Sequence, residues 1–258
     1  IMSMNKRYLL LPLLALNTLA LNATGQTLDT LTRKDKDGWE FMQVRAAHDK
    51  SIVEEGHFHN KVREGVWSSY WNTGYPRRIT TYLHGKKDGL AMSIIQEGSV
   101  DFVEQYKDDK LEGPRRTYYI RGPIFEETYY SDGKKHGKYT KWYKSATIQE
   151  EGYYKNDMRD GRSTWYYEDG QKSVEYDYDD GEINGDAIAY YANGKVSEMG
   201  RYKKGSKTGT WREYHENGNS KAEGKYENNE KNGEWKLFDE QGKFLKAITY
   251  KNGQEVKK

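Results

Sequence analysis

The sequence predicts an all-β protein, an elongated single-layer antiparallel β-meander of about nine 24-residue β-hairpin repeats. Three observations carry this prediction. Glycine recurs every 24 residues over eight units without an insertion or deletion. Asn-Gly, Asp-Gly and related pairs recur at two fixed offsets between these glycines, as hairpin turns require. No segment shows a helical period of apolar residues.

The composition favours a folded chain with a shallow core. Only 34% of the 258 residues are apolar and 32% are charged, which alone would be typical of disorder. The chain nevertheless contains 23 Tyr, 7 Trp and 26 Gly, and its formal net charge is only +2. Amphipathic rings can cover a backbone while their polar edges stay hydrated, so this composition fits a thin sheet.

The first element, residues 1–25, is predicted to be a cleaved secretory signal peptide. A short basic start precedes the apolar run 8–16, and Ala23 and Gly25 occupy positions −3 and −1 of a cleavage site. The alternative is an uncleaved anchor, but the apolar run is shorter than the ~20 residues that a spanning helix needs. We therefore expect export to the periplasm, outer surface or surroundings of a Gram-negative bacterium, with no integral membrane segment after cleavage.

The next element, residues 26–40, is expected to form a leader strand or N-terminal cap. The nine units then occupy residues 41–256, and the first of them is degenerate, as terminal repeats commonly are. Two columns define the unit. They are glycine, at Gly65, Gly89, Gly113, Gly137, Gly161, Gly185, Gly209 and Gly233, and tyrosine, at Tyr82, Tyr106, Tyr130, Tyr154, Tyr178, Tyr202, Tyr226 and Tyr250.

Both turns of each unit are expected to be two-residue hairpin turns with positive φ, exemplified by Asn193-Gly194 and Asp180-Gly181. The strands between them would alternate in length, so some residues must bulge, and the column glycine is suited to a bulge. Aromatic rings are then expected to cross bare glycine backbone, such as that of Gly56 or Gly200. Lysine and arginine stems are expected to pack on the tyrosine column.

A second aromatic column supplies the candidate binding residues. Six residues after the column glycine it contains rings at Trp71, Tyr119, Tyr143, Tyr167 and Tyr191. Its neighbours in the chain, Tyr118 and Trp142 among them, must point to the opposite face, so one series is expected to line the packed side. One hypothesis is an aromatic ladder that stacks a glycan or an extended peptide. The alternative is that the rings are ordinary neighbours on a sheet face.

Motifs for other chemistry are weak or lacking in the sequence. It contains no cysteine, which excludes disulfides and thiol chemistry, and no nucleophile elbow, phosphate loop or zinc motif, so we expect no enzyme and no cofactor. His57, His59 and His84 lack an identified further ligand for a metal. Residues 177–181 fit a hairpin turn better than a calcium loop. Evenly interleaved charges do not favour a nucleic-acid partner.

The run from Gly209 to Gly218, which leads to Tyr226, resembles the MORN repeat, in particular the bacterial variant associated with antitoxins. This resemblance covers about residues 41–256. It implies an elongated sheet with a role in scaffolding, self-association, membrane apposition or partner binding.

The expected function is therefore an exported, non-catalytic scaffold that binds a protein or an envelope surface, or associates with itself through sheet edges. One alternative is an immunity or antitoxin-like protein that neutralises an effector. A second is a groove for glycan or peptide.

Overall fold

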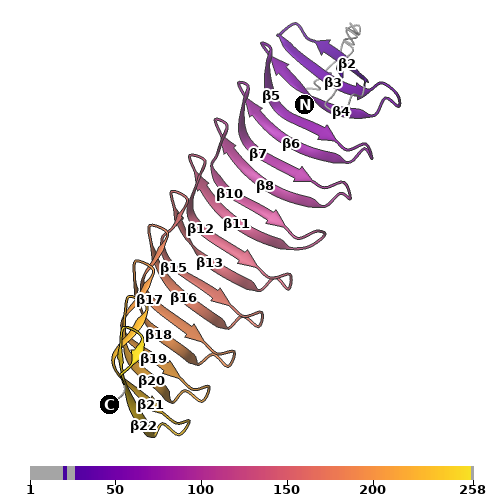
Figure 1. Cartoon of the computed structure of the whole chain (residues 1–258). Coiled ribbons are helices and arrows are strands. Elements are labelled where there is room, and N and C mark those ends of the chain that lie inside the picture. Colours follow the sequence, from indigo (N-terminus) through magenta and orange to yellow (C-terminus); the bar gives the residue numbers. More distant parts are fainter. Residues whose placement is uncertain (1–19, 22–26, 257–258) are drawn as a thin grey trace, which may run out of the picture. The chain divides into compact units, whose positions relative to one another are not determined.

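The computed structural model describes residues 20–21 and 27–256, and within these ranges the chain consists of strands and turns without a helix (Figure 1). The strands are β1 (Ala20–Leu21), β2 (Thr27–Lys34), β3 (Trp39–Ala46), β4 (Ile52–His59), β5 (Val62–Tyr70), β6 (Pro76–Leu83), β7 (Lys86–Ile94), β8 (Val100–Lys107), β9 (Lys110–Leu111), β10 (Gly113–Tyr118), β11 (Ile124–Ser131), β12 (Lys134–Trp142), β13 (Ile148–Lys155), β14 (Met158–Arg159), β15 (Gly161–Tyr166), β16 (Lys172–Asp179), β17 (Glu182–Tyr190), β18 (Val196–Lys203), β19 (Ser206–Tyr214), β20 (Ser220–Glu227), β21 (Glu230–Phe238), β22 (Phe244–Lys251) and β23 (Gln254–Glu255).

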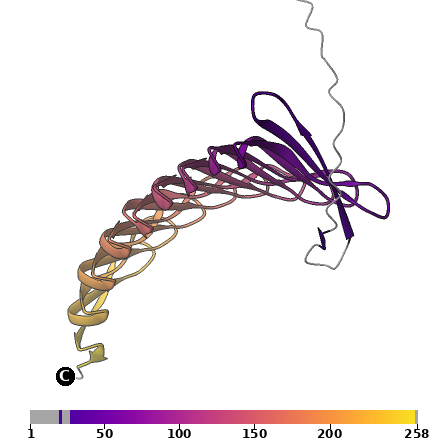
Figure 2. The same cartoon turned by 90° about the horizontal axis from the view of Figure 1, so that it is seen from above.

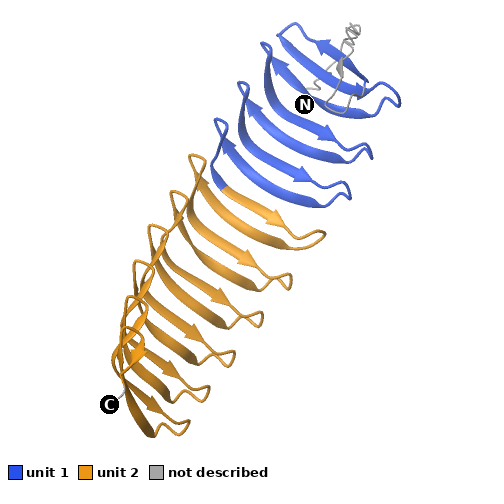
Figure 3. Ribbon diagram, viewed as in Figure 1, with its two compact units in different colours: residues 1–113 blue, residues 114–258 orange. Residues whose placement is uncertain are grey.

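The chain divides into two compact units, residues 1–113 and residues 114–258 (Figure 3). In unit 1 each strand from β2 to β8 pairs antiparallel with the next, and in unit 2 the strands from β15 to β22 do the same. Within each unit the strands form one layer, with no second layer over either face of the described residues (Figure 2). The predicted all-β antiparallel meander is confirmed.

The segments before the repeats are partly described. The predicted signal peptide, residues 1–25, lies outside the described residues except for β1, which pairs with Thr27 and Leu28. The predicted leader region, residues 26–40, contains β2, and β2 pairs along its whole length with β3.

The two turns of each repeat differ in type, and the prediction of two-residue turns at both was wrong for one of them. At the Asp180-Gly181 type of turn both central residues have positive φ, 47° and 86°, as a type I′ hairpin requires. The other turn has three loop residues. In it the amide of Tyr143 donates to the carbonyl of Thr147, that of Ala146 donates to Tyr143, and Ala146 has a φ of 68°. A type I turn followed by a residue in the left-handed conformation also matches the twist of the two strands, but it needs a loop of three residues where the type I′ turn needs two.

The column glycine lies in a β-bulge, as expected. Between β16 and β17 the register advances from the pair Tyr176 and Ala187 to the pair Tyr178 and Ile183, so three residues of β17 oppose one of β16. Gly185 is the middle one of the three, with a φ of 137° that side chains rarely adopt. Ile183 and Ala187, on either side of the bulge, pair with residues of the same face, so the bulge takes up the two extra residues of β17 without changing the alternation of side chains.

The core is one row of side chains, two residues after each column glycine, that the sequence patterns above did not identify. Trp67, Ala91, Ser163, Ala187, Trp211 and Trp235 in this row are each no more than 3% exposed, and Tyr139 is 7% exposed. Where the row holds tryptophan, the facing residue is glycine, as in the pairs of Trp211 with Gly200 and Trp235 with Gly224. The expected crossing of rings over bare glycine backbone is confirmed, and in a single layer it supplies most of the burial.

Candidate binding surfaces

Each unit presents two faces, because successive side chains of a strand point to opposite sides. We call the face that carries Trp67, Trp211 and Trp235 the tryptophan face. The opposite face, which carries Tyr70, Tyr166 and Tyr190, is called the tyrosine face. Since neither face is covered by a second layer among the described residues, both are candidate binding surfaces.

The five candidate binding residues lie just beyond the strand ends, at the three-residue turns, and the structure gives each a hydrogen bond to the following repeat. In every case the side chain donates to the backbone carbonyl 23 residues further on. These bonds run from Trp71 to Ile94 at 2.8 Å, Tyr119 to Trp142 at 2.8 Å, Tyr143 to Tyr166 at 2.7 Å, Tyr167 to Tyr190 at 2.7 Å and Tyr191 to Tyr214 at 2.7 Å.

This row therefore ties neighbouring repeats together at the turns. The residues belong to neither of the packed faces, and their polar atoms are already engaged, so a ligand would meet only the rings. Trp71 differs from the others because the Arg77 guanidinium lies 4.8 Å from its ring centre, beside a shallow cavity of about 480 Å³.

Hydrogen bonds between tyrosine and glutamate organise the tyrosine face. The Tyr166 hydroxyl donates to Glu151 at 2.5 Å, and the Tyr190 hydroxyl donates to Glu175 at 2.6 Å. Burial and the neighbouring carboxylate raise the pKa of both phenols to about 12. These side chains therefore keep their protons, and the bonds persist, at any physiological pH.

An apolar strip interrupts this face in unit 1. Val66 and Leu90 are 54% and 46% exposed, and beside them Ile79, Met92 and Val103 lie in register on β6, β7 and β8. Most of the corresponding positions of unit 2 carry charge, with Lys138 and Arg162 in the column of Val66 and Leu90, and Glu151 and Glu175 in that of Ile79 and Val103. Exposed aliphatic side chains on adjacent strands, bordered by polar residues, are typical of a protein-binding surface.

Aromatic rings and cations alternate on the tryptophan face. In unit 2, Tyr202, Trp211, Tyr226 and Trp235 form a continuous series of edge-to-face contacts, with ring centres 5.1 to 5.8 Å apart. The Lys207 ammonium lies 3.9 Å from the ring centre of Trp211. Lys207 also lies 5.3 Å from the ring centre of Tyr226, and Lys231 lies 5.6 Å from that of Tyr250, so the expected packing of cations on the tyrosine column is confirmed.

Carboxylates complete this arrangement in several hairpins. Arg63 donates to Glu54 at 2.9 Å, and Arg159 and Lys207 pair in the same way with Glu150 and Glu198. In each pair the carboxylate precedes the cation by nine residues, so the two stand on adjacent strands of one face. The cation is thus held between a ring and a carboxylate of its own chain.

Arg159 is the most enclosed of these cations. Its guanidinium lies 5.3 to 5.7 Å from the ring centres of Tyr139, Tyr154, Trp165 and Tyr178, and its side chain is only 23% exposed. Burial raises the pKa of the surrounding tyrosines, Tyr154 and Tyr178 among them. This cage is filled by the chain's own arginine, so its role is structural.

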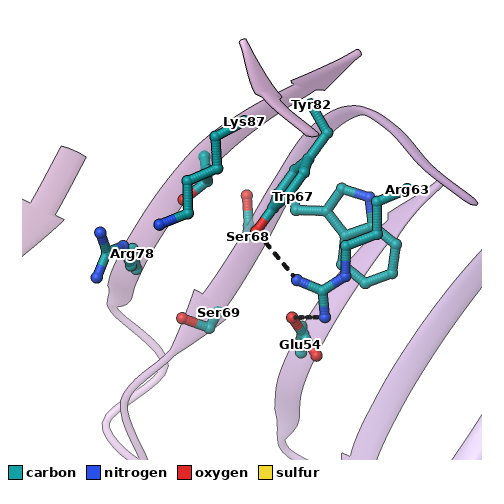
Figure 4. A pocket seen from close by; sticks show the side chains of 9 residues that line it. Glu54, Arg63, Trp67, Ser68, Ser69, Arg78, Tyr82 and Lys87 are labelled. Atoms are coloured by element: carbon teal, nitrogen blue, oxygen red, sulfur yellow. Dashed lines mark hydrogen bonds and ion pairs between the residues drawn. The ribbon is translucent and has the colours of Figure 1, made fainter. Parts of the chain in front are cut away.

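A cavity on the tryptophan face of unit 1 is lined by aromatic rings and cations. It measures about 210 Å³, and its walls include Trp67, Tyr82 and three cations, Arg63, Arg78 and Lys87 (Figure 4). Arg63 is engaged by Glu54 and donates to the Tyr82 hydroxyl at 3.3 Å. Arg78 pairs with Glu104 at 3.2 Å but stays 42% exposed, so Arg78 and Lys87 add positive charge to the wall of the cavity.

Sequence patterns did not single out Arg78 or the row of Trp67. The row could have been found from the sizes of residues eleven positions apart. Where one of the two is small the other is large, as in Gly56 with Trp67 and Tyr176 with Ala187. The signal for Arg78 was its charge, which is opposite to that of Glu54 and Glu150 in the same column.

The histidines show no metal geometry. His59 stacks on Trp39, with ring centres 4.8 Å apart, and His57 contacts Phe41. In the described residues no three His, Asp or Glu side chains gather as ligands for a metal ion. The same part of the chain holds no helix with the length and apolar character to cross a membrane.

Comparison with known families identifies four consecutive stretches of this chain as the MORN repeat variant, residues 159–180, 183–204, 207–228 and 231–252. The resemblance seen in the sequence is confirmed for these repeats of unit 2. No curated protein matches the chain. MORN repeats are protein- and membrane-binding modules without catalytic function.

Proposed function

Since this chain carries MORN-variant repeats, we propose that it is an exported, non-catalytic scaffold that binds a protein partner through the apolar strip of unit 1. The observation that carries this proposal is the exposure of Val66 and Leu90 on a face where most of the equivalent positions in unit 2 are charged. Aliphatic side chains lose water favourably against another apolar surface, by roughly 25 cal/mol per Å² buried.

The strip favours a protein over a glycan. Sugars are held by flat aromatic faces and polar groups, whereas Val66, Ile79 and Leu90 offer neither. The aromatic column proposed for glycan or peptide has its polar atoms bonded to the backbone. An immunity protein that covers an effector would use the same strip, so the identity of the partner decides between the two roles.

Capture of the partner tests the proposal. A photo-crosslinking residue at position 79, within the strip but changed in none of the variants below, should give one discrete protein adduct when the chain is expressed in its natural host. The double variant Val66→Lys, Leu90→Arg introduces residues that the same column holds in Lys138 and Arg162, so it should fold normally and lose the adduct. The matched control is Thr210→Lys, a change in the same column of unit 2, which should keep it. An adduct that survives the double variant, or that contains only glycan, would contradict the proposal.

Export is tested separately. The chain should be recovered from the cell envelope or medium, and N-terminal sequencing should begin at Gln26. Recovery of an intact N-terminus in the cytoplasm would contradict this part of the proposal.

A further inference from the structure

We propose that Arg78 and Lys87 form a receptor for a carboxylate that is supplied by an acidic segment of a protein. The receptor lies on the tryptophan face of unit 1, whereas the apolar strip lies on the opposite face of the same strands. It is therefore independent of the proposed function, and either one can fail without the other.

The first argument is the repeat itself. In the first eight repeats, positions nine residues apart, on adjacent strands of the tryptophan face, form one pair in each hairpin. The pairs are Glu54 with Arg63, Arg78 with Lys87, Phe102 with Leu111, Glu126 with Lys135, Glu150 with Arg159, Val174 with Ile183, Glu198 with Lys207 and Ala222 with Lys231.

These pairs follow a simple rule, with one exception. Four combine glutamate with a cation, two combine apolar residues, and one places alanine before lysine. Arg78 and Lys87 alone among the eight combine two cations. Like charges on neighbouring strands of one face repel, so this pair favours an anion that lies close to both cations.

The geometry leaves room for that anion. Arg78 donates through one nitrogen to Glu104 at 3.2 Å, and its side chain remains 42% exposed. The Lys87 ammonium lies 4.8 Å from the ring centre of Tyr106, and in the described part of the chain it forms no ion pair. Both cations line the cavity, and Figure 4 shows their charged ends turned toward the same side of it.

The chemistry of the other hairpins identifies the ligand as a carboxylate. Where Arg63, Arg159 and Lys207 occupy the position of Lys87, a glutamate of the same chain pairs with the cation. In the hairpin of Arg78 and Lys87 the position of this glutamate is taken by Arg78, which pairs with Glu104 instead, and no carboxylate of the described residues forms an ion pair with Lys87. A guanidinium binds a carboxylate through two parallel hydrogen bonds, and the rings of Trp67 and Tyr82 border the cavity where the methylene stem of an acidic side chain would pack.

The test uses the whole chain and hexaglutamate as the probe. Calorimetric titration should show binding, and amide chemical shifts should move at residues 78 and 87. The variant Lys87→Glu supplies the missing carboxylate within the chain, next to Arg78. Because a charge-assisted hydrogen bond contributes about 1.5–3 kcal/mol, it should weaken hexaglutamate binding about tenfold or more, while the midpoint of thermal unfolding is maintained or rises.

The matched control is Lys231→Glu, which changes the net charge equally in the same column but follows Ala222. It should leave hexaglutamate affinity within about twofold, a difference below 1 kcal/mol. Equal loss in both variants would show that net charge alone attracts the peptide and would overturn the proposal. No binding of hexaglutamate, or tighter binding of tripolyphosphate or of vesicles with anionic phospholipid at the same ionic strength, would also overturn it.

Discussion

Trp211 lies flat across Gly200, so closely that a Cβ atom on Gly200 would come within 2.2 Å of the indole ring. Gly200 does not have a positive φ, so the glycine is required by this contact and not by the backbone. The same relationship recurs between Trp235 and Gly224 and between Trp67 and Gly56. Each of these tryptophans can thus be buried because the residue opposite it is a glycine, which has no side chain.

The variant Gly200→Ala should therefore destabilise the chain. Overpacking of this kind costs about 1–3 kcal/mol, to be measured as a lower midpoint of denaturant unfolding with an unchanged slope. The double variant Gly200→Ala, Trp211→Ala should show that the two changes are coupled, since the tight contact is gone once the ring is removed. Additive effects of the two single changes would show that the contact between them is not the cause.

The tyrosine row at the turns should contribute to stability through its hydroxyls. Changing Tyr143, Tyr167 and Tyr191 together to Phe keeps the rings and removes three bonds to backbone carbonyls. At about 1 kcal/mol per bond, the free energy of unfolding should fall by about 3 kcal/mol. Unchanged stability with lost binding of a ligand would instead support the earlier hypothesis that this column is a binding ladder.

The Arg159 and Glu150 pair should be replaceable as a pair but not singly. Arg159→Ile leaves the nearly buried Glu150 carboxylate without its cation, which should cost about 3–5 kcal/mol. The double variant Glu150→Val, Arg159→Ile copies the natural pair Val174 and Ile183 and should recover most of that loss. Denaturant unfolding of the three variants measures this. A double variant no more stable than Arg159→Ile would show that the four surrounding rings, and not the ion pair, depend on arginine.

Stability should fall in strong alkali. Burial, aided by the glutamates, raises the pKa of Tyr166 and Tyr190 to about 12 from an unfolded value of about 10. Between these values the unfolded chain has lost protons that the folded chain retains, so stability is full below pH ~10 and decreases as the pH rises toward 12. Unfolding followed as a function of pH should show a smaller decrease for Tyr190→Phe. An equal decrease in that variant would assign the effect to other groups.

Much of the fold was predictable because the residues that define the repeat act on neighbours close to them in the sequence. The 24-residue period, the antiparallel meander, the bulge at the column glycine and the packing of cations on rings all follow from residues that are close in the sequence. The three-residue turn at Ala146 was not predicted, because an Asn-Gly pair fits either turn and only the twist of the flanking strands selects one. The binding role of the regular aromatic column stays a prediction, and only the structure shows that its polar atoms bond to the backbone of the following repeat.

The sequence by itself thus determined the repeat, its strands and the resemblance to MORN repeats. Only the tertiary structure decided which face is packed, because the alternation of side chains places Trp67 and Val66 on opposite faces without showing which of the two faces is covered. That decision brings Trp67 onto Gly56 and leaves Val66 exposed. It also sets Arg78 and Lys87 on one face, where two like charges become a place for an anion.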